Sequence, residues 1–254
     1  MNDVEGAQTP RARTLASLGE LSARDDFHET FVRCPIPPEE LLGNLGLFLN
    51  RQTLSRLLAL HELYQRIIDV QGVVIEFGCR WGQNLAMFAS FRGMYEPFNH
   101  TRKIVGFDSF SGFPAISALD GERLAVGGWS VTPGYEDYLD RVLAYHESES
   151  PLSHIKRYEI VKGDVTETLE AYLEAHPETI VALAYFDLDL YEPTKTCLEL
   201  IRDRVTKGTV IAFDEVGWPS FPGETTALKE VLGFDRYALK RFPINPRPSY
   251  LVVE

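Results

Sequence analysis

Short apolar runs rich in β-branched residues alternate with longer helical patterns over most of this chain. The apolar runs, each typical of a buried parallel strand, lie at 73–77, 103–107, 157–162, 180–186 and 208–213. Helical spacing of apolar residues is found at 51–70, 83–92, 136–147, 166–175, 194–205 and 225–232. Strands that alternate with helices predict a mostly parallel sheet with right-handed crossovers.

Both ends of the chain depart from this alternation. Residues 237–242 and 248–253 have the pattern of two strands joined by a turn-rich segment, which predicts a C-terminal antiparallel hairpin. The first residues are polar and mixed, and we expect residues 1–50 to form an N-terminal arm or lid of helices. The expected α/β domain therefore covers residues 51–254, with a mostly parallel seven-stranded sheet and helices on both faces.

Composition narrows the class of protein. The chain has 254 residues, of which 44% are hydrophobic, enough for one α/β domain with a sizeable core. Its net charge of −12 argues against nucleic acid as a partner, since that binding depends on Lys and Arg. No apolar run approaches the roughly 20 residues that span a membrane, and no signal-peptide pattern is present. The odd number of scattered cysteines favours a reducing compartment, so we expect a cytoplasmic protein.

The turn after the first strand has the character of a cofactor loop. Glu76 lies near the strand end, Gly78 and Gly82 follow, and a helical pattern begins after them. Glycine lets a ligand approach the backbone closely, and a helix N-terminus favours anionic groups. A nicotinamide loop would require G-x-G-x-x-G, which is absent. The pattern Glu-x-Gly-x-x-x-Gly instead resembles the first motif of S-adenosylmethionine (SAM) dependent class I methyltransferases, although a tight strand–helix turn is an alternative.

Other acids follow the next strands, where ligands bind in open α/β sheets. Asp108 ends the second strand, and its carboxylate could accept both hydroxyl protons of a ribose. Asp164 ends the third, where the alternative is a helix N-cap.

A denser set of acids follows the fourth and fifth strands. Alternation in an extended strand puts Asp187 and Asp189 on the same face, and Asp214 and Glu215 end the fifth run. These acids converge if the two strands are neighbours in the sheet. Converging carboxylates would raise one another's pKa values, and a hard divalent cation such as Mg²⁺ would relieve this. The alternative is that these acids cap helices or pair with Lys195 and Arg202.

Four segments together resemble the macrocin O-methyltransferase family, class I SAM-dependent enzymes that methylate sugar hydroxyls in antibiotic biosynthesis. They are Ile75–Gly82, Asp108–Pro114, Asp187–Thr194 and Phe213–Gly217. The resemblance runs from about Arg51 to Glu254 and implies a Rossmann-like fold. Two departures are the order Arg80-Trp81, where the family often has Trp-Arg, and Glu215, where it often has a second aspartate.

The resemblance also implies roles for individual residues. Glu76, Gly78 and Gly82 would line the methionine end of SAM. Asp108 and Ser109 would hold its ribose, and Asp164 would face the adenine. A Mg²⁺ ion would be bound by Asp187, Asp214 and Glu215. Asp187 or Asp189 would take the acceptor's proton.

We therefore expect a SAM- and metal-dependent O-methyltransferase that forms a homo-oligomer. Its acceptor would be a sugar hydroxyl, either on a nucleotide-linked deoxysugar or on a glycosylated natural product. One alternative is a catechol-type O-methyltransferase, but Leu190 stands where those enzymes carry a lysine base. A second alternative is a non-catalytic SAM-binding module.

Overall fold

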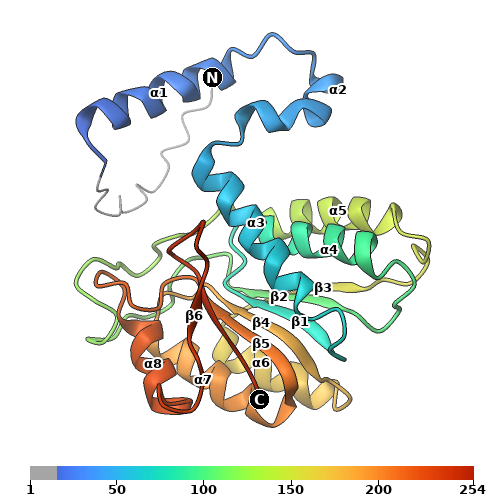
Figure 1. Ribbon diagram of the computed structural model, residues 1–254, viewed down its shortest axis with the longest axis vertical. Coiled ribbons are helices and arrows are strands. Elements are labelled where there is room, and N and C mark those ends of the chain that lie inside the picture. The colour runs from blue at the N-terminus through green and yellow to red at the C-terminus, as the bar shows by residue number, and fades with distance from the viewer. Residues whose placement is uncertain (1–15) are drawn as a thin grey trace.

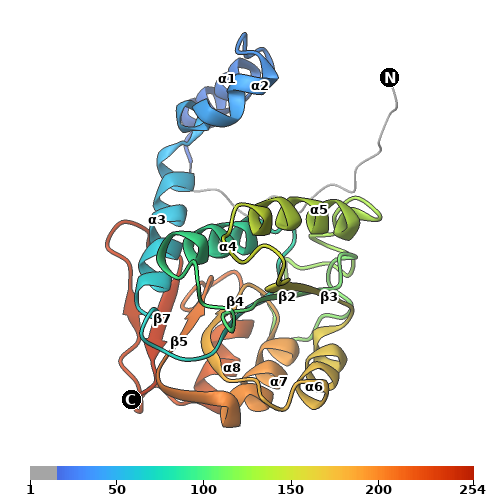
Figure 2. The same ribbon diagram turned by 90° about the vertical axis from the view of Figure 1, so that its right-hand side faces the viewer.

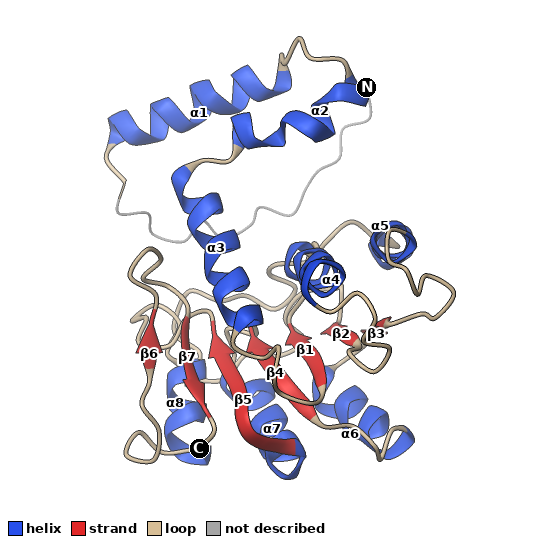
Figure 3. Ribbon diagram, turned by 45° about the vertical axis from the view of Figure 1, so that its right-hand side comes forward, coloured by secondary structure: helices blue, strands red, loops and turns tan. Residues whose placement is uncertain are grey.

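Within residues 16–254, the part of the chain that this computed structural model describes, a seven-stranded sheet lies between two layers of helices (Figure 3). The strand order is β3-β2-β1-β4-β5-β7-β6. The strands are β1 (Val73–Phe77), β2 (Ile104–Asp108), β3 (Tyr158–Lys162), β4 (Val181–Phe186), β5 (Val205–Phe213), β6 (Lys240–Arg241) and β7 (Ser249–Val252). Strands β1 to β5 are parallel, whereas β7 pairs antiparallel with β5 and β6. The predicted parallel sheet and antiparallel C-terminal pair are confirmed.

Helices cover both faces of the sheet (Figures 1 and 3). On one face lie α3 (Arg51–Gln65), α4 (Gln83–Tyr95) and α5 (Tyr135–Ser148). On the other lie α6 (Val165–Ala175), α7 (Tyr191–Ile201) and α8 (Gly223–Val231). Alternate strand residues divide between the two cores: Val74 and Leu183 belong to the first, and Ile75 and Ala184 to the second. Both faces are thus buried, which explains the continuous apolar runs in the sequence.

An arm of helices extends away from the sheet at the N-terminal side of α3 (Figures 1 and 2). It comprises α1 (Leu18–Val32), α2 (Pro38–Leu41) and the 3₁₀ helix η1 (Leu42–Phe48), none of which contains a buried residue. Within the arm, the rings of Phe27 and Phe31 contact Phe48. None of the helices between residues 16 and 254 combines the length and apolar character needed to cross a bilayer.

Several element boundaries differ from the predicted ones, and the helix expected at 51–70 already ends at Gln65. The helix expected at 194–205 begins three residues earlier, at Tyr191, because Pro193 is tolerated in the first turn, where N–H groups lack helical partners anyway. It ends at Ile201, and β5 begins at Val205 because that residue still pairs with β4. In the hairpin, β6 is only two residues long, so the strand expected at 237–242 was predicted too long.

Candidate active site

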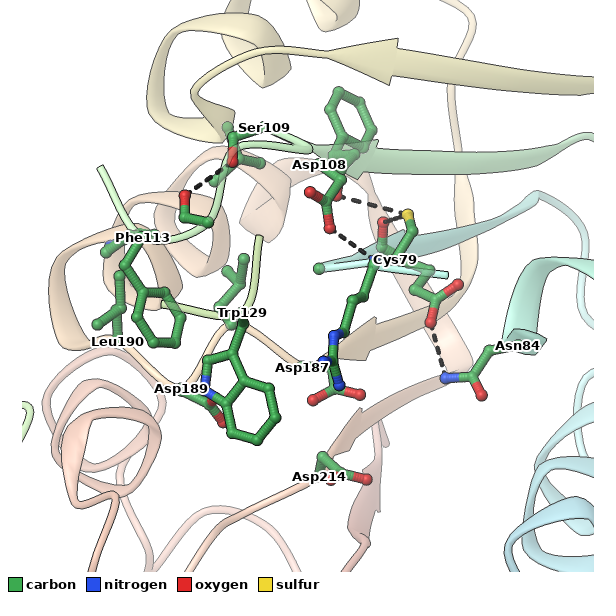
Figure 4. A pocket seen from close by; sticks show the side chains of 18 of the residues that line it. Cys79, Asn84, Asp108, Ser109, Phe113, Trp129, Asp187, Asp189, Leu190 and Asp214 are labelled. Carbon is green, nitrogen blue, oxygen red and sulfur yellow. Dashed lines mark hydrogen bonds between the residues drawn. The ribbon is translucent and has the colours of Figure 1, made fainter. Parts of the chain in front are cut away.

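The C-terminal ends of the parallel strands surround one cavity of about 400 Å³ (Figure 4). Nine of the residues expected to form the site line it: Glu76, Gly78, Asp108, Ser109, Asp164, Asp187, Asp189, Asp214 and Glu215. Gly82 is not part of the lining. The fold therefore brings together, beyond the carboxyl ends of the strands, residues that lie up to 139 positions apart in the sequence.

The two glycines of the first turn are needed for different reasons. Gly78 has φ +85°, and a Cβ there would clash with the backbone carbonyl of Asp187. Gly82 has φ +73° and precedes α4, where a Cβ would clash with Leu139 of α5. Gly78 thus allows the loops after β1 and β4 to approach each other, while Gly82 serves helix packing.

Glu76 is buried and lies at the base of the cavity. Its Oε1 accepts a hydrogen bond from the side-chain amide of Asn84 at 2.7 Å, drawn as the dashed line that ends at Asn84 in Figure 4. Its Oε2 is buried without a hydrogen-bond partner among residues 16–254. Burial and the nearby charge of Asp187 raise the pKa of Glu76 well above its ordinary value. A ligand that brings a cationic N–H donor would satisfy both the free oxygen and the charge.

Asp108 holds the glycine turn in place. Its Oδ2 accepts the backbone N–H of Arg80 at 2.7 Å, and its Oδ1 accepts that of Phe110 at 2.6 Å. Burial raises the pKa of Asp108, although these backbone donors favour the charged form. The hydroxyl of the neighbouring Ser109 donates to the carbonyl of Gly112 at 2.8 Å, within its own loop. The ends of β1 and β2 are therefore joined by one carboxylate.

Asp164 is both a cavity residue and a helix cap. As the N-cap of α6, it accepts the backbone N–H of Thr166 at 2.9 Å and that residue's hydroxyl at 2.7 Å, both through Oδ1. The capping interpretation of this residue is confirmed, and its position beside Gly163 and Val165 also places it in the lining.

A guanidinium links the acids that follow β4 and β5. Arg56 of α3 donates to Asp187 Oδ2 at 2.8 Å and to Asp214 Oδ1 at 2.6 Å. The hydroxyl of Tyr185 also donates to Asp214 Oδ1, at 2.8 Å. The two acids thus converge because their strands are neighbours in the sheet, as expected.

Asp189 and Glu215 complete the carboxylate cluster. Arg247, which precedes β7, pairs with Glu215 and with Asp214 Oδ2, the latter at 3.3 Å. The argument that strand alternation puts Asp187 and Asp189 on one face is wrong, because β4 ends at Phe186 and Asp189 has a left-handed φ of +60°. Both residues nevertheless line the same cavity. The alternative partners, Lys195 and Arg202, pair instead with Glu230 and Asp203.

Burial and mutual repulsion perturb this cluster. Withdrawal from bulk water, followed by the charge of Asp214, raises the pKa of Asp187 to about 8. The same two causes raise the pKa of Asp189 to about 6. At neutral pH an acid with a pKa of about 6 is largely ionised and can accept a proton from a substrate, whereas one with a pKa of about 8 is largely protonated.

The cluster offers the type of donor atom that a hard divalent cation prefers. All of its ligand atoms are carboxylate oxygens, which Mg²⁺ and Ca²⁺ prefer, and Glu215 Oε2 is buried without a partner among residues 16–254. In that same part of the chain, no group of three or more His, Cys, Asp or Glu side chains is arranged to hold a metal ion. Arg56 and Arg247 instead bind several of these oxygens.

Several cavity residues were not identified from the sequence. Arg56 carried a signal, because it stands four residues before Leu60 on the buried face of a helix, where a charge is unexpected. Arg80 and Trp129 form a stacked pair, with the guanidinium carbon 4.6 Å from the ring centre. Both have left-handed φ angles, which in bulky residues often mark functional sites. No local pattern pointed to Asn84 or Arg247.

Two solved structures are similar to this chain over nearly its whole length. One is the calicheamicin methyltransferase CalS11, with 45% sequence identity, 99% of both chains covered and a TM-score of 0.91. The other is apo CalS11, described as a TDP-rhamnose 3′-O-methyltransferase of calicheamicin biosynthesis, with 43% identity, 94% of this chain and 96% of that chain covered, and a TM-score of 0.83. The O-methyltransferase NovP shares the fold at 19% identity, covering 78% of this chain and 79% of its own, with a TM-score of 0.61. Neither a protein-family model nor a curated protein sequence matched.

Proposed function

This chain belongs to the class I SAM-dependent sugar O-methyltransferases of antibiotic biosynthesis, and we propose that it methylates a hydroxyl of a nucleotide-linked deoxysugar. The observation that carries this choice is the 43% identity, over 94% of the chain, with an enzyme described as acting on TDP-rhamnose. TDP-rhamnose is therefore the first acceptor to test. A sugar on a completed natural product is the second.

We assign the SAM end of the cavity to the loops after β1, β2 and β3. The free Oε2 of Glu76 would accept a hydrogen bond from the ammonium group of the methionine part of SAM. Gly78 would let the methionine part lie against the backbone. Asp108 and Ser109 would bind the ribose, and Asp164 would face the adenine. The two backbone hydrogen bonds to Asp108 would orient its carboxylate before SAM binds.

The acceptor end belongs to the carboxylate cluster. We propose that Asp187, Asp214 and Glu215 hold a Mg²⁺ ion, with Arg56 and Arg247 releasing some of the oxygens they now bind. When bound, such an ion would lower the pKa of a sugar hydroxyl and help to orient it.

The chain's own residues would handle the proton. The acceptor oxygen forms a bond to the methyl carbon, the bond from that carbon to the sulfonium breaks, and S-adenosylhomocysteine leaves. The hydroxyl proton passes to Asp189, whose pKa of about 6 leaves it largely ionised at neutral pH, or to Asp187 where that carboxyl is ionised. Buried dipoles and charges that are already in position would supply most of the remaining stabilisation.

Methyl transfer from labelled SAM tests the proposal. We expect turnover with TDP-rhamnose and much less with free rhamnose or catechol. EDTA should abolish turnover and Mg²⁺ should restore it. Asp187→Asn and Asp214→Asn should remove most turnover but leave SAM binding nearly unchanged, because SAM is assigned to the other strand ends. Full activity after exhaustive chelation would refute the proposed metal dependence. A preference for catechol would refute the proposed sugar acceptor.

The acceptor should carry a free hydroxyl next to the one that is methylated. Two neighbouring oxygens would fix the orientation of the substrate better than one. Removal of that neighbour in a matched deoxy analogue should lower mainly kcat. Equal rates with both acceptors would contradict this part of the proposal. We also place the enzyme in the cytoplasm, which suits the free thiols of Cys34, Cys79 and Cys197.

A further inference from the structure

Glu224, the second residue of α8, is a fully buried carboxyl that contacts two loops at once. Its Oε1 accepts the backbone N–H of Leu188 at 3.2 Å, and its Oε2 accepts the backbone N–H of Glu215 at 3.1 Å. Leu188 lies between Asp187 and Asp189, and Glu215 follows Asp214. One side chain therefore joins the two loops that carry all four acids of the cluster.

The sheet itself does not hold these loops beyond the strand ends. The last ladder contact between them is the N–H of Asp214, which donates to the carbonyl of Phe186 at 2.9 Å. Past that point Asp189 has a left-handed φ of +60° and the strand does not continue. Beyond the last ladder contact, Arg56 of α3 bridges the side chains of Asp187 and Asp214. Glu224 bridges the backbones of Leu188 and Glu215. Glu224 is thus the side chain that joins the two loops through their backbones.

Keeping a carboxyl at this position is costly. Glu224 has 0% of its surface exposed, and no salt bridge to it is found among residues 16–254. Burial and three neighbouring acids, Asp187, Asp189 and Asp214, raise its pKa well above the ordinary value. A residue needed only to fill space would be apolar here, because a buried polar group stabilises a fold only through the hydrogen bonds it makes. Its two backbone hydrogen bonds are what an apolar residue could not supply.

The start of α8 lies unusually close to the first loop. A Cβ on Gly223 would stand 2.8 Å from the carbonyl oxygen of Asp189 and 2.6 Å from the nitrogen of Tyr191. The same nitrogen donates to Asp120 of the long loop before α5, at 2.5 Å. Gly223 thus permits the approach that Glu224 uses.

We propose that Glu224 is a positioning residue that sets the spacing between the Asp187–Asp189 loop and the Asp214–Glu215 loop. It acts through backbone hydrogen bonds and does not touch the substrate. We call the two backbone hydrogen bonds to Glu224 the clamp. Only the effect of Glu224 on turnover rests on the proposed function, because the clamp can be measured without any acceptor.

Hydrogen exchange in the wild-type protein tests the clamp directly. The amides of Leu188 and Glu215 lie outside the strands, yet we expect them to exchange slowly, as buried hydrogen-bonded amides do. In Glu224→Gln, one of the two N–H groups would face an amide NH₂ instead of an acceptor. We expect exchange at Leu188, Glu215 or both to become at least about tenfold faster, while Ala184 in β4 is unaffected. Fast exchange of both amides in the wild-type protein would overturn the proposal, even if the variant does not fold.

Kinetics distinguish positioning from general stability. We expect Glu224→Gln to lower kcat with TDP-rhamnose at least about tenfold and to leave KM for SAM within about twofold. Glu224→Asp, which keeps the carboxyl group but is one methylene shorter, should not restore kcat. The matched control is Glu230→Gln on the same helix, where the carboxylate is partly exposed and pairs with Lys195 and Tyr191. An unchanged kcat in folded Glu224→Gln, or an equal loss in Glu230→Gln, would overturn the proposal. If TDP-rhamnose is not the acceptor, the exchange measurement still decides it.

Discussion

At the scale of single residues, the acids of the cavity serve the fold and the chemistry together. Asp108 accepts two backbone N–H groups from the loops after β1 and β2, and it also lines the cavity. The sequence rule that acids at strand ends bind ligands identified the residue but not its backbone partners. Those partners lie on a turn whose conformation depends on the surrounding sheet, so no local pattern could have shown them.

Substitution of Asp108 should therefore weaken cofactor binding strongly. Asp108→Ala leaves the N–H groups of Arg80 and Phe110 without their acceptor and removes the proposed ribose contact. We expect a loss of about 1.5–3 kcal/mol in SAM affinity, the usual range for a hydrogen bond to a charged group. Calorimetric titration with SAM measures this, and Asp137→Ala on the exposed side of α5 serves as the control. Unchanged affinity in a folded variant would show that Asp108 does not contact SAM.

Asp187 should make stability depend on pH in the direction opposite to that of an acid whose pKa is lowered by folding. Its pKa is raised to about 8 in the folded protein, whereas an unfolded aspartate has a pKa of about 4. Between these values the folded state holds a proton that the unfolded state has released. The free energy of unfolding therefore falls as pH rises through this window.

Thermal melts in EDTA from pH 5 to pH 8 check this prediction. Asp187→Asn removes the titrating group, so the fall in Tm with pH should be shallower than in the wild-type protein. Asp189 and Glu76 have raised pKa values as well, so some dependence of the same sign should remain. Parallel curves for the two proteins would contradict the assignment.

At the scale of elements, apolar patterning predicted the sheet well and its ends less well. The five buried parallel strands were identifiable because both faces of the sheet are covered, which makes each strand a continuous apolar run. The start of β5 was missed because its first residues, from Val205 to Gly208, are partly exposed and mostly polar. The position of Arg247 depends on β7 pairing between β5 and β6, and that of Glu224 depends on α8 packing against the loops after β4 and β5. Both are tertiary contacts, which local sequence patterns do not predict.

The glycine turn offers a test at this scale. Gly78→Ala introduces a Cβ that clashes with the backbone of Asp187 in a left-handed conformation, so we expect destabilisation of at least about 1–3 kcal/mol and loss of SAM binding. Gly93→Ala is the matched control, because its Cβ meets nothing within 4 Å inside α4. That substitution should stabilise the protein by about 0.5–1 kcal/mol, the helix preference of Ala over Gly. Chemical denaturation of both variants decides the matter, and similar effects at the two positions would contradict the role assigned to Gly78.

At the scale of the whole molecule, the α/β domain has a buried core, whereas the helices of the N-terminal arm contain no buried residue. Helix α1 has 15 residues and none of them is buried. Isolated helices of this length are marginal in water, and tertiary packing usually stabilises them. The arm also exposes large apolar side chains, with Leu42 at 77% and Leu47 at 64% exposure. The sequence predicted an arm or lid here, and the structure separates it from the sheet (Figure 2).

We predict that a second copy of the chain covers this apolar surface, so that the protein is a dimer or a higher homo-oligomer. Exposed apolar clusters of this kind mark interaction sites more often than they remain in water. Light scattering after size exclusion should give at least twice the mass of one chain. The double substitution Leu42→Lys and Leu47→Lys should shift the protein toward the monomer, because charges in an apolar interface must be desolvated. Ile244→Lys, at an exposed position of the C-terminal hairpin, should not. A wild-type protein that is monomeric at micromolar concentration would contradict this prediction. The alternative, in which the arm is a lid of its own chain, would then be favoured.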